Sequence, residues 1–326
     1  MAVMSDLGSF LYLTSADIKA LELTPVNMES AVEAAFKAIS RGGARTVPKD
    51  GFDVTASTFF HSMPAEYGAG KVVGIKWIGV ALNEHLNLPH TSALIVLNDI
   101  ETAMITAVMD GTLITAMRPA TISLIAARRL AKADSRRLGL IACGTQAMAH
   151  IDAFSGAFPL KEITCHSRRR ETAEAFAREV EKRGFSATVA ATAREAVEGQ
   201  DIVVSTVPRV PGLKPFLDPA WLSPGSFATG VDLARSWICD DLRQIDILAT
   251  DDHAQSKEAG EAGILPWRGG YDAELQQLLS GAHPGRRNDK ERAFFIHPGQ
   301  GLGDIAIALA ACDRAKAAGL GVMLVR

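Results

Sequence analysis

The stretch RLGLIACGTQAMAH, residues 137–150, has the order of a dinucleotide-binding turn. The apolar run that ends at Ile141 predicts a short strand, and the run from Thr145 predicts a helix. Gly144 between them would let the backbone approach a pyrophosphate, whose charge is stabilised at a helix N-terminus. Ala147 fills the last position of the pattern G-x-G-x-x-G/A, where a small residue allows close packing of helix and strand. The stretch therefore predicts the first strand, turn and helix of a Rossmann-like unit.

The first glycine of that pattern is replaced by Ala142. Alanine adopts most turn conformations but is disfavoured at positive φ. We therefore expect a cofactor-binding turn here to keep a negative φ at Ala142. The alternative interpretation is an ordinary strand, turn and helix with no ligand, because a glycine motif alone is weak evidence.

The end of the next predicted strand indicates which dinucleotide this turn would bind. It reads CHSRRRE, with Ser167, Arg168 and Arg169 where NAD-binding units place an acidic residue for the ribose 2′-hydroxyl. A hydroxyl and guanidinium groups suit a 2′-phosphate, since arginine offers positive charge and paired donors. The alternative is a solvated, arginine-rich helix start, although the helix dipole opposes arginine there. The sequence predicts NADP(H) as the preferred cofactor and NAD(H) as the second option.

Alternating strands and helices continue from this turn towards the C-terminus, which is typical of a doubly wound parallel sheet. Upstream, KVVGIKWIGV, SALIVLND and AMITAVMD are consecutive β-rich runs and predict antiparallel strands. An amphipathic helix from Pro25 precedes them. Pro119 should kink the long helical segment after residue 111 or begin a second helix. The glycine-rich 297–303 suggests a linker, after which the last helix returns to the first domain.

The predicted fold class is α/β, with a Rossmann-like doubly wound parallel sheet in residues 118–297 and an α+β domain in residues 1–117 with 298–326. A hydrophobic content of 48% and a formal net charge of −3 argue against a nucleic-acid or membrane-surface partner. Four scattered cysteines predict reduced core thiols, and no cluster has metal-ligand spacing. The first ten residues lack the pattern of a signal peptide. We therefore expect a cytoplasmic protein without a metal.

The sequence resembles the ornithine cyclodeaminase/mu-crystallin family over nearly its whole length. GLIACGTQAMAH is similar to the G-x-G-x-Q-A turn of that family. The stretches VPKD, FFHSMPAEYG, GIKWIG, NLPHTSALIVLND, MDGTLITAMR, TGVDLARSW and DDHAQSKEAGE agree in order and spacing. The nearest-looking branch contains N-(2-amino-2-carboxyethyl)-glutamate dehydrogenase.

The resemblance implies an NAD(P)-dependent enzyme that transfers hydride at the Cα–N bond of a small amino or imino acid. It also implies a homodimer in which the α+β domain binds substrate and pairs the subunits, while the Rossmann domain binds the cofactor. The expected cofactor-binding residues are Gly144, Thr145, Gln146, Ala147, Ser167, Arg168, Arg169, Thr206, Val207 and Val231.

Five residues match positions that the family uses for substrate and catalysis. Arg118 is expected to hold the substrate α-carboxylate with its paired donors. Lys76 is expected near the reacting nitrogen or the carboxylate, and Asp232 is expected to handle the proton on nitrogen. Lys49 is expected to be a second carboxylate contact, and His61 is expected to be a substrate contact or proton donor. The structural alternatives are an exposed helix arginine, a lysine on a solvated strand face, a turn aspartate and a packing histidine.

Two departures from the family pattern argue against ornithine cyclodeamination. Pro119 stands where the family usually has threonine, which removes a hydroxyl and a backbone N–H. His61 and Ser62 stand where cyclodeaminases carry a glutamate. The first reading is therefore an imine or ketimine reductase or an amino-acid dehydrogenase. A redox-neutral lyase with bound NAD and a mu-crystallin-like binding protein remain the alternatives.

Overall fold

The computed structural model describes residues 8–83, 86–210 and 212–326. The chain forms two compact units, which we call unit 1 (Met1–Arg118 with Gln300–Arg326) and unit 2 (Pro119–Gly299). Their boundaries lie within two residues of the expected ones, and the role expected for each unit stays a prediction. Most of the stretch used to argue against a signal peptide, residues 1–7, lies outside the described residues.

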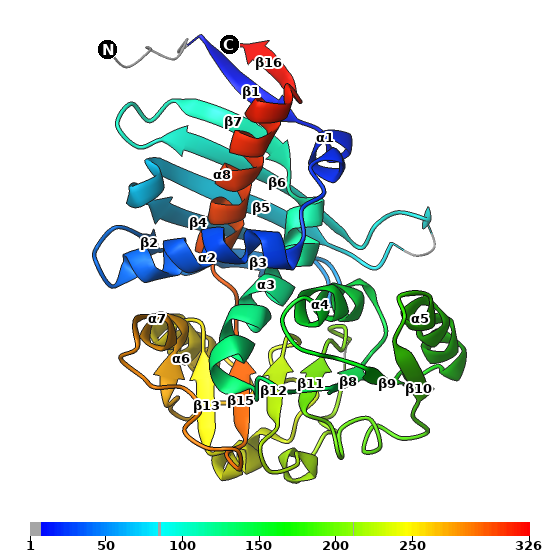
Figure 1. The fold of residues 1–326 in the computed structure, drawn as a ribbon. Coiled ribbons are helices and arrows are strands. Elements are labelled where there is room, and N and C mark those ends of the chain that lie inside the picture. Colours follow the sequence, from blue (N-terminus) through cyan, green and yellow to red (C-terminus); the bar gives the residue numbers. More distant parts are fainter. Residues whose placement is uncertain (1–7, 84–85, 211) are drawn as a thin grey trace. The chain divides into compact units, whose positions relative to one another are not determined.

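Unit 1 is a mixed sheet covered by helices (Figure 1). The sheet runs β16-β1-β7-β6-β5-β4-β2, and β3 also pairs with β4. Its central strands are antiparallel, as predicted, whereas β1 is parallel to β7. The elements of unit 1 are β1 Ser9–Leu13, α1 Ser15–Ala20, α2 Pro25–Ile39, β2 Arg45–Thr46, β3 Asp50–Asp53, β4 Phe59–Tyr67, β5 Val72–Val80, β6 Thr91–Asp99, β7 Ile105–Asp110, the start of α3 Thr112–Leu130, α8 Gly301–Ala318 and β16 Val322–Val325.

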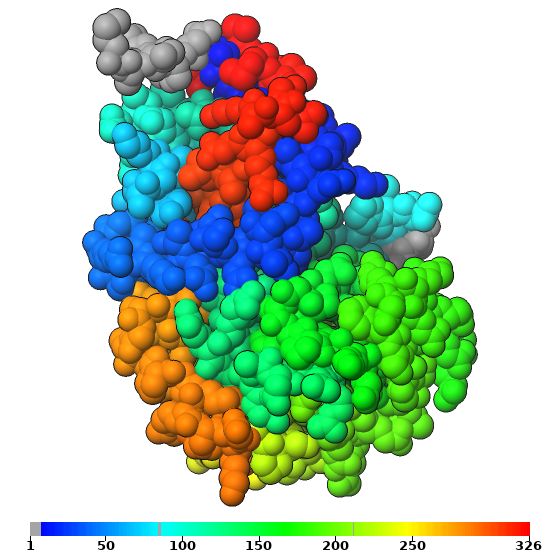
Figure 2. Space-filling view, viewed as in Figure 1, coloured from blue at the N-terminus to red at the C-terminus, as the bar shows by residue number. Residues whose placement is uncertain are grey.

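Alternation along β5 explains one buried and one exposed sheet face. Val72, Lys76 and Ile78 are buried, whereas Val73 and Trp77 are exposed, as the two-residue period of a strand requires. Helices cover the buried face. In particular, α2 packs against α8, and the two lie side by side in the space-filling view (Figure 2).

The last helix returns to unit 1, as expected, but the segment before it is not an exposed linker. Residues 297–303 are all buried, and α8 already begins at Gly301. A Cβ at Gly301 would lie 2.4 Å from the Met63 carbonyl oxygen. The glycine-rich composition therefore serves close packing of α8 on β4, which composition alone does not distinguish from flexibility.

Unit 2 is a parallel sheet in the order β10-β9-β8-β11-β12-β15-β13-β14, with helices around it (Figure 1). This confirms the Rossmann-like part of the predicted fold class. Its elements are the rest of α3, β8 Arg137–Ile141, α4 Thr145–Ser155, β9 Glu162–His166, α5 Arg170–Lys182, β10 Ser186–Val189, β11 Ile202–Ser205, β12 Phe227–Gly230, β13 Ile247–Thr250, α6 His253–Glu261, β14 Ala273–Glu274, α7 Leu275–Ser280 and β15 Ala293–Ile296.

The strand order reverses beside β8, where the expected cofactor turn begins. Strand β8 has β9 on one side and β11 on the other, so the strands that follow it in the sequence lie on both of its sides. In open parallel sheets, ligands bind at the carboxyl ends of the strands at such a switch point. The helix α3 continues through Pro119 as one element. Among the described residues, no helix has the length and hydropathy to cross a membrane, and no group of three or more acidic, histidine or cysteine residues could hold a metal ion.

Candidate functional site

The turn after β8 leaves open space for a ligand at Gly144. This residue precedes α4 and has φ −120°, a conformation that any residue adopts, and a Cβ there would meet no protein atom within 4 Å. Neither backbone strain nor protein packing therefore requires glycine. No side chain caps the N-terminus of α4, so its first backbone N–H groups can bind an anion. Together with the fully buried Ala147, this geometry fits a dinucleotide pyrophosphate.

The expectation of a negative φ at Ala142 is wrong. Its φ is +70°, in the left-handed region that glycine occupies without strain. Its N–H donates to the carbonyl oxygen of His166 over 2.9 Å, and the Thr206 hydroxyl donates to its carbonyl oxygen over 3.3 Å. These bonds hold the alanine in the conformation that the missing glycine would adopt. The turn therefore keeps a glycine-like backbone although alanine replaces the first glycine of the pattern.

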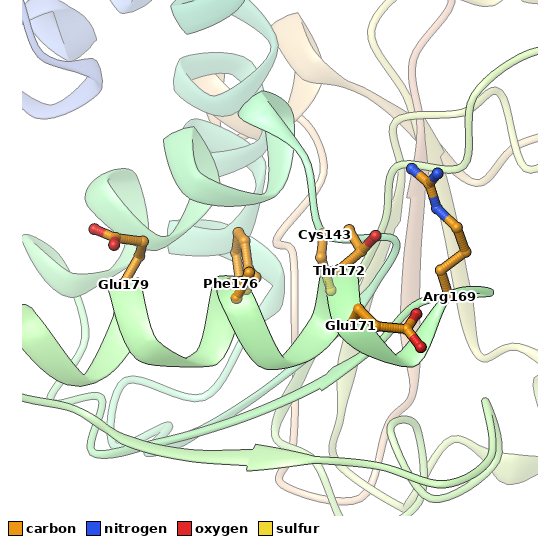
Figure 3. A pocket seen from close by; sticks show the side chains of 7 residues that line it. Cys143, Arg169, Glu171, Thr172, Phe176 and Glu179 are labelled. Atoms are coloured by element: carbon orange, nitrogen blue, oxygen red, sulfur yellow. The ribbon is translucent and has the colours of Figure 1, made fainter.

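An open groove of about 600 Å³ lies between this turn and the start of α5. Figure 3 shows Arg169, Glu171 and Thr172 near the first turn of α5, and Cys143 on the turn opposite. Cys143 is half-buried, as is Cys239, so the expectation of a core thiol is wrong for these two residues. The groove is lined by Cys143, Arg169, Glu171, Thr172, Ala175, Phe176 and Glu179.

The arginines at the end of β9 differ in what they contact. Arg170 forms an ion pair with Glu174, with 2.8 Å between Nε and Oε1. Arg168 and Arg169 are exposed and form no ion pair with any other described residue. Arg169 is also the N-cap residue of α5 and makes no side-chain capping bond. Two guanidinium groups at this strand end thus stay available to an anion, although Glu171 and Glu179 also line the groove.

The remaining cofactor candidates follow the carboxyl ends of the central strands. Thr206 follows β11 and donates its N–H to the Ile141 carbonyl oxygen over 2.9 Å. Val231 follows β12 and donates to the Ser205 carbonyl oxygen over 3.0 Å. Other candidates lie at corresponding places, with Ser167 directly after β9. The first turn of α4 contains Thr145 and Gln146, and Val207 lies two residues after the end of β11.

Asp232 is buried and held by two hydroxyl groups. Ser205 donates to its Oδ1 over 2.9 Å, and Ser236 donates to its Oδ2 over 2.6 Å. Behind Ser205, the indole N–H of Trp237 donates to the serine oxygen over 2.9 Å. Burial raises the pKa of Asp232 to about 6, against the opposing effect of the two hydroxyls and of Arg235. A carboxyl group with this pKa exchanges a proton near neutral pH.

The backbone after Asp232 is strained. Leu233 and Ala234 have φ values of +61° and +55°, two consecutive left-handed residues without glycine. Such strain persists where the surrounding structure holds it, and it gathers at functional sites. The residue pattern did not indicate the strain, and it did not identify Ser205 and Ser236 as the partners of Asp232.

Unit 1 contains a buried cluster of three charges. Lys76 Nζ lies 2.7 Å from Asp304 Oδ1, and Arg118 Nε lies 3.4 Å from Asp304 Oδ2. The side chains of Lys76 and Asp304 are fully buried, and that of Arg118 is 9% exposed. A solvated lysine and an exposed arginine, the structural alternatives, are therefore wrong. Two cations share one carboxylate, so the cluster keeps positive charge that suits an anionic ligand.

Burial lowers the pKa of Lys76 to about 8. The Asp304 carboxylate opposes this effect, whereas the positive charges of Arg118 and Lys49 add to it. Lys49, directly before β3, is thus close enough to act on Lys76. His61 lies in β4 on the same sheet face, two residues before Met63, which pairs with Lys76. Its ring centroid is 5.0 Å from that of Phe59.

The cluster brings together Lys76 and Arg118, whose roles stay predictions, but sequence reasoning missed Asp304. The only signal was an acidic residue in the first turn of a helix whose first half is otherwise apolar, after a glycine-rich segment. At 228 positions from Lys76, nothing in the local pattern relates the two residues.

Comparison with known proteins gives a consistent match. The model of the ornithine cyclodeaminase/mu-crystallin family matches residues 11–319. Ketimine reductase mu-crystallin of Mus musculus is 32% identical over 232 residues, which are 69% of this chain and 71% of that protein.

Two solved structures match almost the whole chain. The Δ1-pyrroline-2-carboxylate reductase of Thermococcus litoralis, in complex with NADH and L-proline, has a TM-score of 0.85 and 25% identity, with 96% of this chain and 99% of that chain covered. An archaeal alanine dehydrogenase dimer with bound NAD has a TM-score of 0.84 and 27% identity, with 97% and 99% covered.

Proposed function

Because this chain belongs to the ornithine cyclodeaminase/mu-crystallin family, we propose that it is an NADP(H)-preferring oxidoreductase acting on the Cα–N bond of a small amino or imino acid. The observation that carries the proposal is the buried cationic cluster of Lys76 and Arg118, in a chain whose other unit has a dinucleotide-binding turn. The relatives that bind NADH with L-proline, or NAD, support the same class of chemistry.

The residues of this chain take separate roles in the proposed reaction. Arg118 and Lys76 bind the α-carboxylate and fix the position of the Cα–N bond. Asp232 donates a proton to the nitrogen when an imine is reduced, and it accepts that proton in the reverse direction. When bound, the nicotinamide ring supplies or accepts the hydride.

The preference for NADP(H) rests on the end of β9. Residues 167–169, directly after this strand, include no carboxylate that could bind a ribose 2′-hydroxyl, whereas Arg169 lines the groove and Arg168 is exposed beside it. One or two charge-assisted hydrogen bonds to a 2′-phosphate, at about 1.5 kcal/mol each, favour NADPH over NADH by roughly tenfold or more. The negative charge of Glu171 in the same groove repels a 2′-phosphate and so opposes this preference.

The deciding experiment is a substrate screen that follows three signals at once. Purified protein is mixed with NADPH and either cyclic imino acids or 2-oxo acids with amines. Consumption of NADPH supports the proposal. Ammonia release from diamino acids without net consumption would instead support a lyase, and tight binding without turnover would support a carrier. In parallel, replacing Arg168 and Arg169 by alanine should equalise the affinities for NADPH and NADH. Equal affinities in the wild-type protein would refute the preference.

The proposal includes a homodimer that covers the exposed face of the unit 1 sheet. Phe52, Trp77 and Leu94 are 57%, 43% and 41% exposed. Phe60 stacks between Phe52 and Trp77, with ring centroids 5.8 and 5.6 Å away. An apolar patch of this kind is typical of a protein interface, and the archaeal alanine dehydrogenase is a dimer. A second copy of this chain is therefore the partner we assign to this face.

A further inference from the structure

The carboxylate of Asp304 joins the two cations to which the proposed function assigns the substrate carboxylate. Its Oδ1 accepts a hydrogen bond from Lys76 Nζ over 2.7 Å. Its Oδ2 lies 3.4 Å from Arg118 Nε. These two atoms form an ion pair, and neither has a hydrogen-bond partner among the described residues. Asp304 has no exposed surface, so its carboxylate does not contact bulk water in this structure. Both cations are thus held by one buried anion.

Glycines allow this helix turn to lie so close to the strands. A Cβ at Gly74 would lie 2.6 Å from Ile305 Cδ1, and one at Gly301 would lie 2.4 Å from the Met63 carbonyl oxygen. A side chain at Gly301 would push α8 away from β4, whereas one at Gly74 would displace the side chains of Ile305 and Leu97. Asp304 also sits in the first turn of α8, where the helix dipole stabilises a negative charge. The position is therefore built to keep an ionised carboxylate against Lys76.

Without Asp304, two like charges would face each other in a buried site. Arg118 and Lys49 both disfavour a charge on Lys76, and so does burial itself. We propose that Asp304 is a positioning residue that keeps Lys76 charged and aligned beside Arg118, so that both cations can bind one substrate carboxylate. This inference rests on the proposed function for the role of the carboxylate, and on unit 1 alone for the geometry.

The test uses Asp304→Asn, which removes the charge and keeps the shape, with Asp304→Glu as the charge-conserving variant. Asp313→Asn on the exposed side of the same helix is the matched control. Lysine labelled with ¹³C at the ε-carbon reports the charge state of Lys76 by NMR, with its signal assigned from a Lys76→Met variant. We expect a pKa of about 8 in the wild type, and a value lower by about one to three pH units in Asp304→Asn, because a neighbouring opposite charge raises a lysine pKa by this amount.

Binding provides the second measurement. Pyrrole-2-carboxylate, a planar carboxylate without a reducible imine, is titrated against each protein across pH. Asp304→Asn should bind this carboxylate roughly tenfold more weakly at neutral pH. As pH rises, both proteins should lose affinity when Lys76 loses its proton, and the variant should do so at a lower pH than the wild type. With any imino acid that is turned over, KM should rise by a similar factor while kcat changes less. Asp304→Glu and Asp313→Asn should keep the wild-type pH dependence.

The outcomes separate this inference from the proposed function. If the wild type reduces no imino acid, the proposed function fails, but the lysine titration still decides whether Asp304 sets the charge of Lys76. If Asp304→Asn does not fold, Asp304→Glu carries the test, and a fall of its Lys76 pKa by more than one pH unit would overturn the inference. An unchanged Lys76 pKa and unchanged carboxylate affinity in Asp304→Asn would also overturn it.

Discussion

Replacing Ala142 with glycine should stabilise the protein, although it removes a methyl group from a folded turn. Ala142 has a φ of +70°, and this region costs an L-residue roughly 1–2 kcal/mol that glycine avoids. Against this gain, glycine increases the freedom of the unfolded chain, at a cost of about 0.4–1 kcal/mol. The two hydrogen bonds of the Ala142 backbone, to His166 and from Thr206, do not depend on its side chain. The net expectation is a gain of about 0.5–1 kcal/mol in the free energy of unfolding.

The assay is thermal and denaturant unfolding of unit 2 in the intact chain. For a unit of roughly 180 residues, a gain of 1 kcal/mol raises Tm by about 2–4 °C. Ala147→Gly in the same motif is the control with the opposite sign, because this alanine lies within α4, where glycine costs about 1 kcal/mol. Since the backbone of the turn is already glycine-like, affinity for NADPH should stay within a few-fold in Ala142→Gly. Destabilisation of Ala142→Gly comparable to that of Ala147→Gly would refute the argument from strain.

Three further changes test the cofactor turn, the proton and the dimer. Gly144→Val should leave Tm nearly unchanged, because the new side chain meets open space. It should lower NADPH affinity by roughly tenfold or more in a fluorescence titration, because phosphate contacts of the turn are lost. Normal binding of NADPH would show that this turn is not part of the cofactor site. Asp232→Asn should lower kcat by about 10²–10⁴-fold. In the wild type, reduction should slow as pH rises through about 6, because Asp232 then loses the proton it donates, whereas oxidation should accelerate over the same range; a flat profile in both directions would count against its role. Trp77→Glu should convert a dimer into a monomer in light scattering, since a charge would enter the covered apolar face, and an unchanged mass would show that the dimer forms elsewhere.

Periodicity and turn chemistry were sufficient to predict most of the fold. The strand alternation of β5–β7 and the amphipathic pattern of α2 act over a few residues, so the sequence carries them directly. The strand β15 was not predicted, and it enters the sheet between β12 and β13. Its position depends on pairing with strands distant in sequence, which a local pattern does not encode.

The sequence offered site candidates where residues match the positions of a family. Lys76 and Arg118 were named in this way, but their burial was not predicted, because a solvated lysine and an exposed arginine remained open until the structure showed both side chains buried. Asp304 could not be assigned, because its meaning comes from a partner 228 positions away. The φ of Ala142 was predicted with the wrong sign. An alanine side chain favours a negative φ, whereas the backbone hydrogen bond from Ala142 to His166 holds a positive one.

The discontinuity of unit 1 also sets the order in which the nascent chain can fold. Unit 2 is one uninterrupted segment, and all its strands have been synthesised before α8 exists. The larger segment of unit 1, residues 1–118, is made earliest, yet Lys76 lacks the Asp304 carboxylate as a partner until α8 leaves the ribosome. Domains fold as units during synthesis, on a timescale that residue-by-residue elongation sets. The part of the protein that is translated first is therefore completed last, and until then its sheet lacks both the covering helix α8 and the edge strand β16.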